Sequence, residues 1–65
     1  MKIKSYSELR IGETFRFKEG NQIYFMKISM EKDHSYFYVC MFGELMGKIY
    51  PALEDDFKIF ADEQI

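Results

Sequence analysis

Two side chains in this sequence, His34 and Cys40, belong to the types that most often bind metals or attack substrates. A zinc site needs three or four protein ligands, and the chain supplies one histidine and one cysteine. A catalytic Cys–His pair needs the two side chains in contact, but six residues of extended chain separate them by about 20 Å. We therefore interpret His34 as a solvated turn residue and Cys40 as a small buried apolar side chain. We expect no metal and no cofactor.

A run of carboxylates, Glu54, Asp55 and Asp56, is the second feature that could do chemistry. Two carboxylates act as general acid and base when they converge on one pocket, whereas adjacent residues of an exposed turn more often form a solvated run of charges. The functional alternative is an acidic surface that attracts a basic partner and raises its association rate. The residues predicted for this acidic face are Glu44, Glu54, Asp55, Asp56, Asp62 and Glu63.

Aromatic side chains provide a third candidate surface. The segments 22–30 and 35–42 predict strands that are apolar on both faces. Because a small barrel buries only one face of each strand, some rings are left over, and either loops cover them or they form an exposed interface. The residues predicted for this aromatic surface are Phe25, Tyr36, Tyr38 and Phe42. Together with Arg16 and Lys27, such rings could instead stack on nucleotides.

Length and composition limit the architecture that must position these residues. Sixty-five residues make a single domain, residues 1–65, near the lower size limit for folding without disulfides or metals. Seven Phe and five Tyr raise the aromatic share to 18%, and each ring buries about 150–250 Å². We therefore expect aromatic side chains to replace the larger aliphatic core that so short a chain cannot build.

Charge is distributed unevenly along the chain. Residues 1–34 hold seven basic and five acidic side chains, residues 35–65 hold two basic and six acidic ones, and the net charge is −2. Non-specific binding to nucleic acids depends on neutralising phosphates, which an acidic chain does poorly. The charge pattern therefore favours a basic protein partner over a nucleic acid.

Several classes of protein are disfavoured by what the sequence lacks. One cysteine cannot form the intramolecular disulfides that small secreted domains usually carry. No apolar run approaches the roughly 20 residues that cross a bilayer, and residues 1–5 form no apolar signal core. We expect a cytoplasmic protein without membrane contact. Because no nucleophile–base pair and no phosphate-binding loop is present, we expect no enzymatic activity.

The hydrophobic pattern predicts strands separated by short turns. Alternation predicts a strand over 14–18, and longer strands follow over 22–30 and 35–42. Shorter strands are predicted over 44–50, with a bend at Gly47, and over 57–60. Ser7 could cap a single helical turn that Gly12 closes. Turns of two to five residues imply antiparallel connections, so the prediction is an all-β, five-stranded antiparallel SH3-like barrel with at most one short helical turn.

The spacing of Tyr6, Leu9, Gly12 and Phe15, the strand residues 25–29 and the run Gly43-Glu44-Leu45 resemble a known pattern. This pattern, aromatic-x-x-Leu-x-x-Gly-x-x-Phe followed by an aromatic-x-Lys-Ile strand and a Gly-Glu-Leu turn, is similar to that of small uncharacterised β-barrel proteins of bacteriophages and mobile elements. The resemblance covers most of residues 6–60. It implies a small barrel of phage or mobile-element origin and transfers no catalytic residue.

These observations together lead to one expected function and two alternatives. The expected function is a small phage- or mobile-element-encoded binding protein that inhibits a host defence complex, as anti-CRISPR proteins do, through its acidic face. The partner is then a host protein or protein complex of basic character. The first alternative is a nucleic-acid-binding barrel that uses the strand aromatics, and the second is a homodimeric structural accessory protein.

Overall fold

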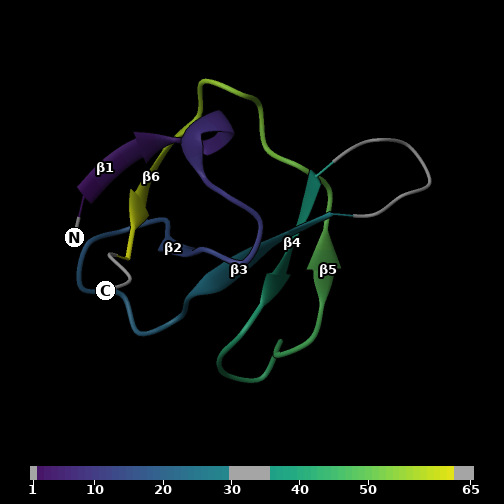
Figure 1. Ribbon diagram of the computed structural model, residues 1–65. Coiled ribbons are helices and arrows are strands. Elements are labelled where there is room, and N and C mark those ends of the chain that lie inside the picture. The colour runs from purple at the N-terminus through teal and green to yellow at the C-terminus, as the bar shows by residue number, and fades with distance from the viewer. Residues whose placement is uncertain (1, 30–35, 63–65) are drawn as a thin grey trace.

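The computed structural model describes residues 2–29 and 36–62, and in them the protein is all-β (Figure 1). The strands are β1 (Lys2–Ser5), β2 (Thr14–Arg16), β3 (Phe25–Ser29), β4 (Tyr36–Cys40), β5 (Ile49–Tyr50) and β6 (Lys58–Ala61). One 3-10 turn, η1 (Tyr6–Glu8), connects β1 to the chain that leads into β2. The predicted all-β class and the single short helical turn are confirmed.

All six strands belong to one antiparallel sheet in the order β1-β6-β2-β3-β4-β5. The prediction of five strands is wrong because Lys2–Ser5 forms an additional edge strand, in which Lys2 pairs with Ala61 and Ser5 with Lys58. The sheet is also not a closed barrel: in the part of the chain that the structure describes, β1 pairs only with β6, and β5 pairs only with β4. An edge strand as short as the two residues of β5 offers few backbone groups for closing the ring.

The core lies between the two halves of the curled sheet and is built mainly from rings. Its buried residues are Tyr6, Leu9, Phe15, Tyr38, Ile59 and Ala61, with Phe17, Phe25, Tyr50 and Leu53 packed against them. Phe15 is completely buried, and its ring contacts those of Tyr6, Phe25 and Tyr38 at centroid distances of 5.6–5.9 Å. The expectation of an aromatic core therefore holds.

The pairing of β3 with β4 decides which strand faces are buried. Phe25 lies opposite Cys40, and Lys27 lies opposite Tyr38. Cys40, Lys27 and Tyr38 are all buried, so these positions face the core. The intervening pairs, such as Met26 with Val39, lie on the other face of the sheet and are half-buried.

The predicted strand over 44–50 is mostly a turn. Gly43 and Gly47 both adopt positive φ angles, +88° and +89°, a conformation that glycine reaches without steric cost. Cys40 accepts a hydrogen bond from the Gly47 N–H and donates one to the Lys48 carbonyl, so two residues oppose one, as in a β-bulge. The bend predicted at Gly47 is confirmed, and the chain regains strand pairing only at Ile49–Tyr50.

The turn η1 is fixed to the loop that precedes β6. The Tyr6 N–H donates to the Phe57 carbonyl at 2.8 Å, and the Ser7 N–H donates to the Asp55 carbonyl at 3.0 Å. The turn begins after Ser5, not at the predicted cap Ser7, and the Ser5 N–H donates to the Glu8 carboxylate at 2.9 Å. These bonds hold η1 and the loop 52–57 together at one end of the sheet, the top in Figure 1.

Candidate functional site

An apolar pocket of about 330 Å³ opens at the opposite end of the sheet. At this end the loop that leads into β3 approaches the turn between β4 and β5, at the bottom of Figure 1. Six residues line the pocket: Ile23, Phe25, Cys40, Phe42, Glu44 and Leu45. Five of them are apolar, and Glu44 is the one charged residue.

The ends of two paired strands form the inner wall of this pocket. Phe25 is the first residue of β3 and pairs with Cys40, the last residue of β4, so both lie at the edge of the core. The Phe25 ring packs against Phe17 and Tyr38 at 5.1 and 5.5 Å. Cys40 is buried, and its thiol donates to the Phe42 carbonyl with a sulfur–oxygen distance of 3.2 Å. The inner wall is therefore held rigidly by core packing.

Large apolar side chains that line the pocket, or directly follow one that does, remain exposed to solvent. We call this set the apolar rim; it consists of Ile23 (42% exposed), Phe42 (45%), Leu45 (53%) and Met46 (65%). Leu45 and Met46 belong to a tight turn, in which the Met46 N–H donates to the Gly43 carbonyl at 3.2 Å. Because the turn is short, no other segment of the described chain covers the side chains of Leu45 and Met46.

Glu44 lies in the same turn and is exposed. In residues 2–29 and 36–62, no lysine or arginine forms an ion pair with its carboxylate, since the ion pairs there are Lys4–Glu13 and Arg16–Asp62. The pocket thus combines an apolar interior with one unneutralised negative charge.

The residues predicted for the aromatic surface do not all lie together in the structure. Phe25 and Phe42 line the pocket, but Tyr38 is buried in the core, stacked on Tyr50 at a centroid distance of 5.2 Å. Tyr38 therefore does not contribute to an exposed surface, because its side of β4 faces inward. The side chain of Tyr36 lies outside the described part of the structure.

The residues predicted for the acidic face also lie at different places in the structure. Glu44 lies beside the pocket, whereas Glu54, Asp55 and Asp56 lie in the loop at the other end of the sheet (Figure 1). Asp62 binds Arg16 at 3.1 Å and accepts a hydrogen bond from Thr14 at 2.9 Å, so its charge is neutralised locally. The predictions for Glu63 and for His34 fall outside the described residues.

Lys27 is a buried cation whose role the sequence pattern did not reveal. It is 4% exposed, and its Nζ donates to the carbonyls of Tyr6 and Leu9 at 2.9 and 2.8 Å. The ammonium also lies 4.5 Å from the centroid of the Tyr6 ring. Burial lowers the pKa of Lys27, and the charges of Asp55 and Glu13 partly oppose this shift. The sequence feature that could have indicated this role is a single lysine on the strand face that also carries Phe25.

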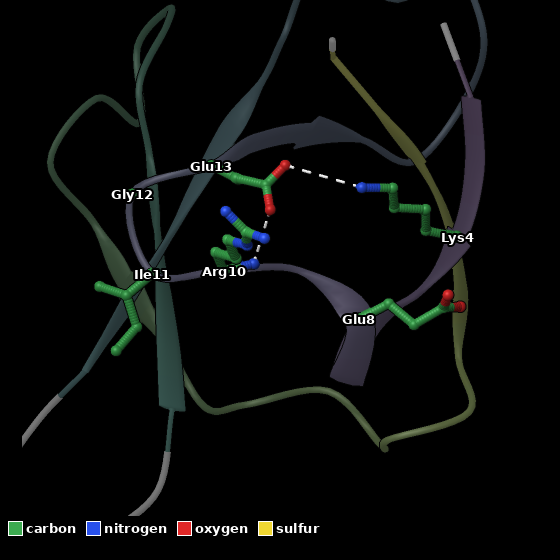
Figure 2. Close-up of a pocket in the computed structure, with 6 residues that line it drawn as sticks. All are labelled: Lys4, Glu8, Arg10, Ile11, Gly12 and Glu13. Carbon is green, nitrogen blue, oxygen red and sulfur yellow. Dashed lines mark hydrogen bonds and ion pairs between the residues drawn. The ribbon is translucent and has the colours of Figure 1, made fainter. Parts of the chain in front are cut away.

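A second hollow, of about 680 Å³, lies beside η1 and is polar. Figure 2 shows the Glu13 carboxylate joined by dashed lines to Lys4 and to Arg10. The Glu13 carboxylate accepts a bond from the Arg10 N–H at 2.7 Å and lies 3.8 Å from the Lys4 ammonium. The bond from the Ser5 N–H lowers the pKa of Glu8, which also lines this hollow. Two cations and two anions leave no net charge that would select a ligand.

The described residues show no metal site and no membrane-spanning helix. Residues 2–29 and 36–62 contain no group of three or more His, Cys, Asp or Glu side chains arranged to hold a metal ion. The same residues contain no helix long and apolar enough to cross a membrane. Comparison with protein-family models, with curated proteins and with solved structures found no match to this chain.

Proposed function

We propose that this protein is a protein-binding module and that the apolar rim is its contact surface. The observation that carries the proposal is that three large, exposed apolar side chains, Ile23, Phe42 and Leu45, line one pocket, and that exposed Met46 follows Leu45 in the same turn. Contiguous apolar patches on soluble proteins usually mark interaction sites. Phenylalanine and methionine are also enriched in the buried centres of protein interfaces. The single negative charge of Glu44 favours a partner with basic character.

The residues that a nucleic-acid-binding function would need are engaged within the fold. The ammonium of Lys27 is buried against backbone carbonyls, and Arg16 binds Asp62 and the Asn21 carbonyl. The Tyr38 ring is in the core. Stacking on nucleotides requires exposed rings beside available cations, so these contacts support the protein-binding proposal over the nucleic-acid alternative.

The narrower form of the proposal is inhibition of a host defence complex. It depends on the resemblance of residues 6–60 to small phage and mobile-element proteins. In this form the basic partner would be a component of that complex, and the identity of a captured partner would test it directly.

Affinity capture with matched variants tests the proposed contact surface. We would compare the natural sequence, Leu45→Asp in the rim and Ile11→Asp as a control, since Ile11 is 57% exposed and lies outside the rim. Lysate of the source organism would be treated with nuclease, and circular dichroism would confirm that both variants fold. We expect the natural protein and the Ile11 variant to retain the same partner and the Leu45 variant to lose it.

Three results would contradict this proposal or redirect it. Retention of the same partner by Leu45→Asp would show that the rim is not the contact surface. Capture that disappears on nuclease treatment would favour the nucleic-acid alternative. A dimer in light scattering that the Leu45 variant dissociates would make a second copy of this chain the partner.

A further inference from the structure

We infer that the apolar pocket accepts one large apolar side chain from a partner segment in which a lysine or arginine lies next to that side chain. This inference rests on the proposed protein-binding function and specifies the chemistry of the segment that binds. It joins two features that the sequence presented separately, since Phe25 and Phe42 belong to the predicted aromatic surface and Glu44 to the predicted acidic face.

The dimensions and lining of the pocket determine the apolar part of the ligand. A volume of about 330 Å³ is near the lower end of ligand sites, which span about 300–1,000 Å³. The inner wall is the Phe25 ring and the buried side of Cys40, and neither residue carries a charge that an inserted group would have to satisfy. One aromatic or long aliphatic side chain suits such a space, as an anchor residue does at the centre of an interface.

The carboxylate of Glu44 determines the charge beside the anchor. It is the only charged group that lines the pocket, and no cation neutralises it in the described part of the chain. A lysine or arginine adjacent to the anchor would meet this carboxylate at the mouth. The Phe42 ring, 6.3 Å from the ring of Tyr24, provides an aromatic surface at the same place, and aromatic faces attract cations.

The extent of the rim indicates a polypeptide as the ligand. Leu45 is more than half exposed and Met46 is 65% exposed, and Met46 does not line the pocket itself. A small organic amine in the pocket would leave these side chains in water. A peptide chain that places its anchor in the pocket continues on both sides and covers them, so that the surrounding contacts exclude water from the anchor.

Nuclear magnetic resonance titration with short capped peptides tests this inference on the intact chain. The probes are Gly-Lys-Phe-Lys-Gly, its charge-reversed counterpart Gly-Glu-Phe-Glu-Gly and the anchorless Gly-Lys-Ala-Lys-Gly. The methyl groups of Ile23, Leu45 and Met46 report binding at the pocket, and the methyls of Ile3 and Ile11 serve as remote controls. We expect the basic phenylalanine peptide to bind weakly and saturably, and at least about fivefold more tightly than the acidic one. The anchorless peptide should leave the rim methyls unshifted.

A variant of Glu44 separates charge recognition from apolar binding. Glu44→Gln keeps the size of an exposed side chain, so the fold should be retained. Loss of one exposed ion pair predicts about two- to fivefold weaker binding of the basic peptide, and Glu44→Lys should reverse the preference between the two charged peptides.

Equal binding of the basic and acidic peptides, or shifts confined to the remote methyls, would overturn the inference. If neither phenylalanine peptide binds while Leu45→Asp still abolishes capture of the natural partner, the proposed function stands and the inference fails. If the peptides bind as expected but capture does not depend on Leu45, the proposed function fails instead.

Discussion

Replacing Lys27 by methionine tests how the closed end of the sheet is held together. The Lys27 ammonium connects β3 to η1 and to the residue that follows it by donating to the Tyr6 and Leu9 carbonyls. Methionine has a similar length and no donor, so Lys27→Met keeps the volume and removes both hydrogen bonds. Because Lys27 is 4% exposed, water cannot reach the carbonyls without local opening of the structure.

The magnitude of this effect follows from the hydrogen bonds and the cation–π contact that the substitution removes. The Leu9 carbonyl loses its bond from Lys27, at a cost of about 1–3 kcal/mol, whereas the Tyr6 carbonyl still accepts a bond from the Leu9 N–H. A desolvated cation–π contact contributes about 2 kcal/mol more. Relief of the desolvation that lowers the pKa of Lys27 offsets part of this loss. We therefore expect Lys27→Met to reduce the free energy of unfolding by about 2–4 kcal/mol. For a domain of this length, total stability is about 3–10 kcal/mol, so the variant should lose a large share of it.

Urea denaturation followed by far-ultraviolet circular dichroism measures this change, since the chain contains no tryptophan for fluorescence. Lys48→Met is the matched control, because Lys48 is exposed and its ammonium lies 5.3 Å from the Tyr50 ring centroid. We expect the control to lose no more than about 1 kcal/mol. If the two variants have equal midpoints, the buried hydrogen bonds of Lys27 do not stabilise this end of the sheet, and the reasoning is refuted.

Three further predictions concern the core, one turn and the pH dependence of stability. Phe15→Ala should cost about 3–5 kcal/mol, measured by the same urea titration, because Phe15 is completely buried. Gly47→Ala should cost about 1–2 kcal/mol, since φ is +89° while the space for a Cβ is open. Burial raises the pKa of Tyr6 to about 12 and also raises that of Tyr38, so their contribution is full below pH 10 and is lost as the unfolded chain releases its phenol protons above it. The urea midpoint, measured at several pH values between 8 and 12, should therefore decrease as the pH rises above 10. The lowered pKa of Lys27 has the opposite effect, a stability that increases with pH, but only below about pH 10.5.

Alternating hydrophobicity over 14–18 and long apolar runs over 22–30 and 35–42 predicted strands correctly. The segments around Phe15, Phe25 and Tyr38 all lie in strands of the sheet. The strand Lys2–Ser5 was missed because an exposed edge strand buries little apolar surface. Its lysines are compatible with an edge strand and with a solvent-exposed loop alike. The strand over 44–50 was predicted too long because its apolar residues begin within a turn that Gly43 and Gly47 make possible.

The sequence named three of the residues that line the pocket, but it indicated neither their grouping nor Ile23, Leu45 and Met46 of the apolar rim. Glu44, Phe25 and Phe42 were all named from the sequence, yet in two separate surfaces. Only the pairing of Phe25 with Cys40 and the tight turn after Phe42 bring them to one pocket. The burial of Tyr38 could not be read from an apolar strand with two similar faces, because sheet curvature chooses the inner face.

The two ends of the sheet differ in the solvent exposure of their apolar side chains, and this difference supports a binding role for the open end. At one end η1 and the loop 52–57 are bound by backbone hydrogen bonds and by Lys27, and Tyr6 and Leu9 are buried. At the other end Leu45 and Met46 extend from a turn that nothing in the described chain covers. Exposed apolar side chains contribute little to folding, so Leu45→Asp should leave the free energy of unfolding within about 0.5 kcal/mol of the natural protein. An unchanged stability combined with lost capture would assign Leu45 to binding, whereas a large loss of stability would assign it to the core.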